Sequence, residues 1–310
     1  MKKILKANTY FLIILLLGII LPKYLVYIYG ALGISDIRLI LALNHMLLFI
    51  VPAIIYVVVT KANIKETFRL NKLYIKDVLL IIVIGFIAYI FMACFAAISS
   101  MFFMNDVGNF ITSISSTPYP ILLLLIALMP AITEEITMRG IILSGYDGKS
   151  RIKAAIVVGL LFGMIHMDLQ QFLYTAVLGA LLAYLVRVTN SIFSSVLVHF
   201  IVNGISITLS SFVMDTSEYT DAVSQQLDII NLSFDMKLSM IVVYIIMAIA
   251  IGGLIFKLIR ILERWNIERN AEHLIKEKNI VASEERIINV PLILSIVIYI
   301  IVMAKVYFIR

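Results

Sequence analysis

Long apolar stretches separated by short polar segments run along the whole chain. A spanning α-helix needs about 20 mostly apolar residues, so each long stretch is a candidate for a membrane crossing. The candidates are roughly 8–30, 37–59, 77–104, 119–143, 154–167, 170–186, 191–213, 238–259 and 287–308. The pattern therefore predicts an all-α fold, a polytopic transmembrane helical bundle with about eight or nine membrane segments.

The fifth and sixth stretches are shorter than the others. Only Met167, Asp168 and Leu169 separate them, so we expect a tight helical hairpin that does not fully cross the membrane. The sequence contains no internal repeat or low-complexity stretch. It therefore predicts a single transmembrane domain over residues 1–310, with the chemistry concentrated in a core at about 120–206.

Composition agrees with this reading. The chain is 62% hydrophobic and 14% charged, whereas a soluble domain is about half apolar and about a quarter charged. Lipid must therefore solvate much of the apolar surface, and membrane lipids are expected partners. The single cysteine, Cys94, can form no internal disulfide or thiolate metal cluster. Nothing in the sequence indicates nucleic-acid binding.

The distribution of charge predicts an orientation. If the N-terminus lies in the cytoplasm, most of the 25 Lys and Arg residues fall on cytoplasmic segments, as the positive-inside rule requires. The connection near 214–236 then lies outside. It carries five acidic residues, Asp215, Glu218, Asp221, Asp228 and Asp235, and no Lys or Arg. We expect a multi-pass protein of the cell membrane with a cytoplasmic N-terminus, and the short loops favour a bacterial source.

Ionisable residues in the fourth stretch call for an explanation, because each costs about 2.5–3.5 kcal/mol to insert at the centre of a spanning helix. Glu135 and Arg139 are four residues apart and share a helix face, so they can pair. Glu134 is rotated by about 100° from Glu135 and points elsewhere. A purely structural Glu–Arg pair explains two of these residues but leaves Glu134 without a role.

Two further polar motifs follow in the apolar stretches. His166 lies in the fifth stretch, and His199 and Asn203 lie one turn apart on one face of the seventh. A single histidine in a helix is commonly a hydrogen-bonded core residue, and a His–Asn pair can simply join two helices. Acid–base and amide groups in three such segments are more specific, so we predict that they converge on one site.

The residue types allow two kinds of chemistry. Glu134 can act as a general base on water, since a carboxylate removed from bulk solvent binds a proton more tightly. His166 can orient that water or protonate the leaving amine, and His199 and Asn203 can donate hydrogen bonds to an oxyanion. Alternatively, Glu134, His166 and His199 can ligate a divalent metal such as zinc. No H-E-x-x-H motif is present, and the sequence leaves both mechanisms open.

The three motifs resemble the signature of a known family. They are Glu134-Glu135-x-x-x-Arg139, Phe162-x-x-x-His166 and His199-x-x-x-Asn203. This pattern is similar to that of the CAAX-protease and bacteriocin-processing family of intramembrane proteases, which includes the type II CAAX prenyl endopeptidases. The resemblance covers about residues 120–206. Met138 departs from it, because the family often has an aromatic residue before the Arg-Gly pair.

The resemblance implies an intramembrane endopeptidase that acts on a membrane-associated protein or peptide, and it leaves both a metalloprotease and a metal-independent mechanism open. Glu134 would activate water, and His166 and His199 would be its essential partners. Asn203 would donate to the oxyanion. The supporting residues would be Glu135, Arg139 and Phe162. The family also includes bacterial members tied to bacteriocin maturation or self-immunity, so a prenylated substrate is not carried over.

Two other functions fit parts of the pattern. A catalytically silent immunity or scaffold protein could share the fold, but loss of activity would be expected to show at Glu134 or a histidine. A proton-coupled transporter could use intramembrane Glu, His and Arg, with Asn44 and His45 of the second stretch on its path. The sequence shows no inverted repeat of the kind common in transporters. We predict that His45 is a polar contact inside the bundle.

Overall fold

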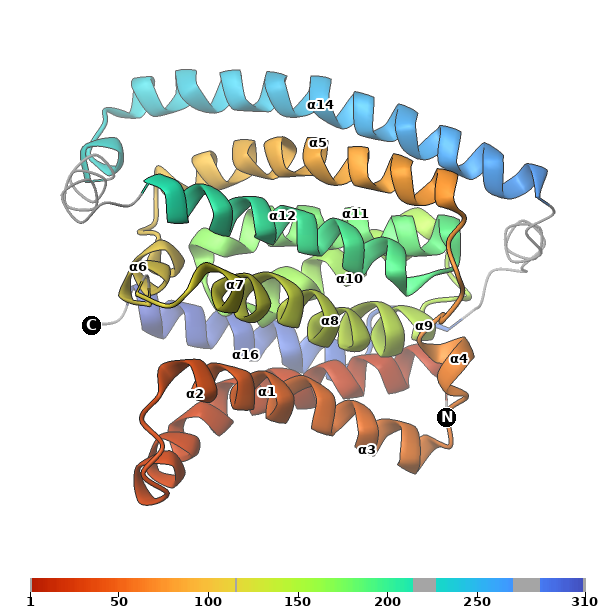
Figure 1. The fold of residues 1–310 in the computed structure, drawn as a ribbon, viewed down its shortest axis with the longest axis horizontal. Helices are drawn as coiled ribbons and strands as arrows, with labels where there is room; N and C mark the ends of the chain where they lie inside the picture. Colours follow the sequence, from red (N-terminus) through yellow and green to blue (C-terminus); the bar gives the residue numbers. More distant parts are fainter. Residues whose placement is uncertain (1, 115, 214–226, 270–284, 309–310) are drawn as a thin grey trace.

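The computed structural model describes residues 2–114, 116–213, 227–269 and 285–308 (Figure 1). Within these ranges the only regular secondary structure is helical, which confirms the all-α bundle. Among the described residues, eight helical stretches are long and apolar enough to cross a membrane. The chain is therefore a multi-pass membrane protein.

Two of the described spans, the second and the fourth, are built from more than one helical piece. The spans are α1 (Lys3–Ala31); α2 (Ile37–His45) with η1 (Met46–Ile50) and α3 (Val51–Thr60); α5 (Ile75–Ser100); α7 (Tyr119–Leu122) with η2 (Leu123–Leu128), α8 (Met129–Glu135), η3 (Ile136–Ile142) and α9 (Leu143–Gly145); α11 (Leu169–Thr189); α12 (Ile192–Val213); α14 (Phe234–Glu268); and α16 (Val290–Tyr307). Shorter helices are α4 (Ile64–Thr67), α6 (Asp106–Ser113) and α10 (Arg151–Ile165).

The elements named η are π-helical, and they occur in only two of the described spans, the second and the fourth. The π segments η2 and η3 enclose α8, which carries Glu134 and Glu135. Pro130 lies near the start of α8 and has no N–H to donate to the preceding turn. π turns are rare in proteins, and those that do occur are frequently found at functional sites. The π segments on both sides of α8 therefore make α8 a candidate for the functional site.

The predicted hairpin is present, with one correction. The helix α10 has 15 residues and is not among the eight candidate spans, whereas α11 has 21 residues and is one of them. The sixth stretch is therefore longer than its apolar run suggested, because Arg187 and Thr189 continue the helix beyond it. Met167 between the two helices has a φ of 52°, and the Asp168 side chain caps the start of α11.

Glycines allow α10 and α11 to pack closely. A Cβ added at Gly159 would lie 2.5 Å from the carbonyl oxygen of Ala176, and one at Gly179 would lie 2.8 Å from Cβ of Phe162. Small residues at such crossings let two helix backbones approach each other within a membrane. The hairpin thereby holds Phe162 and the end of α10 in a fixed place beside α11.

Basic connections gather at one end of the bundle. The N-terminus, α4 and α9 lie at this end, and α6 and the C-terminus lie at the other (Figure 1). Arg69, which follows α4, forms an ion pair with Asp147 and donates to Asn190 Oδ1 at 3.1 Å. Arg187 donates to the carbonyl oxygen of Tyr146 at 3.3 Å. Connections far apart in sequence are thus joined at the end where the charge pattern grouped them. Part of the acidic connection, 214–226, lies outside the described residues.

We expect Gly159→Ala to destabilise the protein, because the new methyl group meets backbone atoms of α11 that cannot move aside. Overpacking of this kind typically costs about 1–3 kcal/mol. Thermal unfolding of the purified protein in detergent would measure the loss.

The matched control is Gly253→Ala in α14, where nothing lies within 4 Å of the added methyl group. This change should be neutral or stabilising by up to about 1 kcal/mol, since Ala is the better helix former. An equal melting temperature for both variants would show that α10 and α11 are not packed as closely as described.

Candidate active site

The centre of the polar cluster is an ion pair between Glu135 and Arg139. Both side chains are fully buried, and Arg139 Nη1 donates to Glu135 Oε1 at 2.9 Å, which confirms the predicted pairing. Arg139 Nη2 also donates to the carbonyl oxygen of Gly179 at 3.0 Å. The pair is therefore compensated inside the bundle, and it ties the fourth span to α11.

His199 extends the pair to a second carboxylate. Its Nδ1 atom lies 2.9 Å from Glu135 Oε1, and its Nε2 atom lies 3.9 Å from Glu134 Oε2. An ionised carboxylate only accepts hydrogen bonds, so Nδ1 carries a hydrogen and donates it to Glu135. The imidazole is thus oriented by one glutamate so that its other nitrogen faces the neighbouring glutamate.

The two adjacent glutamates differ in environment. The Glu135 side chain is 0% exposed, whereas the Glu134 side chain is 12% exposed. The rotation between neighbouring helix positions turns Glu135 toward Arg139 and leaves Glu134 beside His199. Glu134 is the carboxylate that water can reach more readily.

Phe162 packs at the junction of the charged and imidazole groups. The guanidinium carbon of Arg139 lies 4.4 Å from the centre of its ring. The rings of His166 and His199 make edge-on contacts with Phe162, with centroid separations of 4.8 Å and 5.8 Å. His166 Nδ1 lies 2.7 Å from the carbonyl oxygen of Phe162 and donates to it. Phe162 therefore fixes both imidazoles relative to Arg139.

Asn203 is one turn beyond His199 on α12. Its Nδ2 atom donates to the carbonyl oxygen of Ile126 in η2 at 3.2 Å. That bond uses one of the two amide hydrogens and joins α12 to the span that carries Glu134. The described hydrogen bond of Asn203 is thus to the backbone of the fourth span and not to Glu134.

One polar residue of the cluster was assigned no role there from the sequence. His45 Nδ1 lies 3.1 Å from Thr133 Oγ1, and the imidazole interacts electrostatically with Glu134, His166 and His199. The sequence did contain a signal, because Asn44 and His45 are adjacent polar residues in an apolar span. That signal gave no indication of which helix the histidine would meet.

The described residues do not form a ready ligand set for a metal. Among them, no three His, Cys, Asp or Glu side chains are arranged to hold a metal ion. His199 Nδ1 is engaged by Glu135, and the nearest approach of His199 Nε2 to Glu134 is 3.9 Å.

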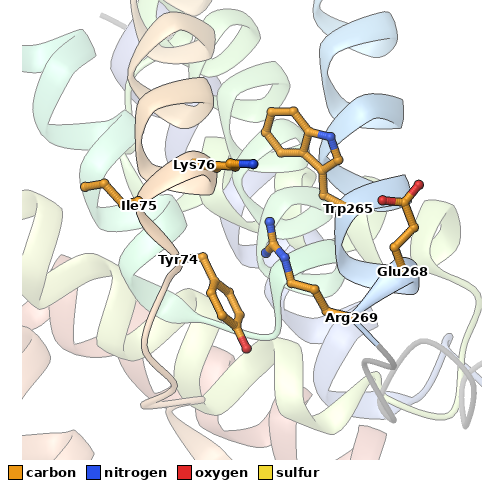
Figure 2. A pocket seen from close by; sticks show the side chains of 6 residues that line it. All are labelled: Tyr74, Ile75, Lys76, Trp265, Glu268 and Arg269. Carbon is orange, nitrogen blue, oxygen red and sulfur yellow. The ribbon is translucent and has the colours of Figure 1, made fainter.

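A cavity of about 450 Å³ lies elsewhere, between the start of α5 and the end of α14 (Figure 2). Its lining residues are Tyr74, Ile75, Lys76, Trp265, Glu268 and Arg269. The guanidinium of Arg269 lies 4.2 Å from the centre of the Tyr74 ring and donates to Asp77 at 2.7 Å and 2.9 Å. These contacts join α5 to α14, and no residue of the polar cluster lines the cavity.

Comparison with known proteins agrees with the motif-based resemblance. Residues 116–205 match the family described as type II CAAX prenyl endopeptidase Rce1-like. The match is less than a third of the chain, and it contains all three motifs but not His45. Comparisons with curated proteins and with solved structures gave no match. The family that this segment resembles is a protease family, so the resemblance suggests hydrolysis of peptide bonds.

We expect Arg139→Ala to reduce the yield of folded protein, because it removes the guanidinium that compensates the buried charge of Glu135 and leaves His199 as the partner of that carboxylate. Breaking a buried ion pair in this way typically costs about 3–5 kcal/mol. The measurement is the monodisperse fraction on size-exclusion chromatography together with a melting curve.

The control is Arg38→Ala, which removes the exposed pair with Asp36 and should leave yield and melting temperature unchanged. An Arg139→Ala protein with normal yield and melting temperature but no activity would contradict a supporting role for Arg139. It would instead place the guanidinium in the chemistry.

Proposed function

We propose that this chain is an intramembrane endopeptidase that hydrolyses a peptide bond of a membrane-associated protein or peptide. The observation that carries the proposal is His199, which is bonded to buried Glu135 through Nδ1 and faces Glu134 through Nε2. This arrangement lies within the segment that resembles a protease family. It brings a carboxylate that can act as a base, Glu134, within 3.9 Å of an oriented imidazole nitrogen, His199 Nε2.

In the proposed reaction Glu134 is the general base. It takes a proton from water while the water oxygen forms a bond to the carbonyl carbon of the substrate. The tetrahedral intermediate then collapses, the C–N bond breaks, and the proton held by Glu134 passes to the leaving nitrogen. His166 orients the water by accepting its hydrogen at Nε2, since His166 Nδ1–H is already donated to the carbonyl oxygen of Phe162.

The developing oxyanion requires donors. We assign this role to Asn203, which keeps a second amide hydrogen after donating the first to Ile126, and to His199 in its doubly protonated form. His199 Nε2 can donate to the oxyanion only while both ring nitrogens carry a hydrogen, because Nδ1–H is already donated to Glu135. Fixed donors of this kind need little reorganisation when negative charge appears on the substrate oxygen.

The direction of access follows from the charge pattern. We assign the end with the N-terminus, α4 and α9 to the cytoplasm, because the basic connections gather there. Glu134 and Glu135 are followed by fewer residues of their span than precede them, so they lie nearer this end. The substrate would enter from the cytoplasmic side or from the inner leaflet.

Cysteine labelling tests this orientation in a Cys94→Ala background. Lys65→Cys, in exposed α4, should react with a membrane-impermeant maleimide only after cells are permeabilised. Ser35→Cys, in the connection after α1, should react in intact cells. The reverse pattern would refute the assignment of the cytoplasmic end.

We expect Glu134→Gln to abolish cleavage and leave the fold intact. Gln is nearly isosteric with Glu but cannot accept a proton from water, and loss of a general base typically slows a reaction by about 10²–10⁴-fold. Mass spectrometry of products from a reconstituted peptide library would measure cleavage, and a melting curve would measure folding.

The control is Glu66→Gln in α4, an exposed carboxylate that should leave cleavage at the wild-type rate. Equal cleavage by the wild type and by Glu134→Gln would remove Glu134 from the mechanism. Absence of cleavage by every form would favour a scaffold or transporter over a protease.

A further inference from the structure

His45 brings a fourth helix to the polar cluster. It is the last residue of α2, in the second span, and it lies far outside the segment that matches the protease family. Its Nδ1 atom lies 3.1 Å from the hydroxyl oxygen of Thr133, the residue that precedes Glu134 in α8. The side chain therefore reaches the immediate neighbour of the proposed base.

The direction of this hydrogen bond can be deduced from the partners of Thr133. The Thr133 hydroxyl donates its only proton to the carbonyl oxygen of Met129 at 3.0 Å. The hydroxyl oxygen can then only accept from His45, so the hydrogen of the His45 ring is on Nδ1. This bond requires the Nδ1–H tautomer of His45. Together with the bond from Thr133 to Met129, it links α2 to the backbone of α8.

The surroundings of His45 differ from those of a simple interhelical contact. The half-buried ring interacts electrostatically with Glu134 of α8, with His166 at the end of α10 and with His199 of α12. Its ring also packs against Phe49, with centroids 5.5 Å apart. His45 is therefore directed toward the cluster, whereas the adjacent Asn44 accepts a hydrogen bond from Tyr29 of α1 at 2.9 Å.

Both partners of the bond lie next to irregular helix. The π segment η1 begins directly after His45, and α8 has π segments on each side. The regular hydrogen bonding of an α-helix is interrupted at these junctions, so the backbone alone holds the short α8 less firmly. A side-chain bond from a neighbouring span supplies a constraint at the turn that carries Glu134.

We propose that His45 is a positioning residue of the site, which holds the Glu134 turn of α8 toward His199 through its Nδ1–H bond to Thr133. The inference rests on the proposed function, because it states that His45 increases the rate of the proposed peptide hydrolysis. It predicts that loss of the bond lowers kcat more than it changes KM. A displacement of about 1 Å in a reacting group can slow a reaction by about 10²-fold.

Four variants separate the bond from the imidazole itself. His45→Ala and Thr133→Val each remove the bond, and each should lower kcat by about 10–100-fold with KM nearly unchanged. The double variant should be no slower than either single one, because both remove the same contact. His45→Asn places an amide N–H near the position of Nδ1, so it should recover most of the lost kcat.

The control is Asn44→Ala, which breaks a hydrogen bond of the same helix to α1 and should leave kcat near the wild-type value. Melting curves of all variants accompany the kinetics. If His45→Ala does not fold, Thr133→Val tests the same bond with a residue of nearly equal shape.

Wild-type kcat in Thr133→Val or His45→Ala, even with a lower melting temperature, would make the contact merely structural and overturn the inference. A His45→Asn protein as slow as His45→Ala, with Thr133→Val fully active, would overturn it as well, because the imidazole would then act directly. Equal cleavage by Glu134→Gln and the wild type, or no wild-type cleavage, would instead remove the proposed function and this inference with it.

Discussion

The buried pair of Glu135 and Arg139 is the interaction on which the polar cluster depends. An uncompensated charge in a membrane-spanning bundle is costly, so these side chains have little freedom to separate. Glu135 also orients His199 through Nδ1, and Arg139 lies over the face of Phe162, whose ring contacts both imidazoles. The donation from Arg139 to the carbonyl oxygen of Gly179 joins the pair to α11, against which α10 packs closely at Gly159 and Gly179.

This arrangement gives two identical, adjacent residues different tasks. Glu135 is fully enclosed and has a guanidinium and an imidazole as partners, which makes it a fixed structural acceptor. Glu134 is partly exposed and has only the more distant His199 nitrogen as an ion-pair partner among the described groups. A hydrolase inside a bilayer needs both properties. It must hold charge in an apolar medium, and it must leave one base open to water.

Much of the fold was predictable because a bilayer imposes a length and an apolar composition on each span. The Glu135–Arg139 pair was predictable from its local spacing, and the convergence of the motifs from their residue types. The contacts of His45 with Thr133, 88 residues away, and of Asn203 with Ile126, 77 residues away, depend on how separate helices cross. Hydropathy carries no information about such crossings. Hydropathy also does not predict the π segments, because these depend on which backbone carbonyl oxygen accepts the hydrogen bond from each N–H.

Those π segments affect how the fourth span must be compared with related chains. A π turn bonds each N–H to a carbonyl five residues back instead of four, so it accommodates an extra residue while the helix continues. Positions on the two sides of η3 are therefore out of phase on a regular helical wheel. A homologue with an uninterrupted α-helix here would align only if a one-residue gap were placed inside the helix. A gap in the middle of a membrane span is usually rejected as an error, yet here it would keep the residues before and after η3 on their proper faces.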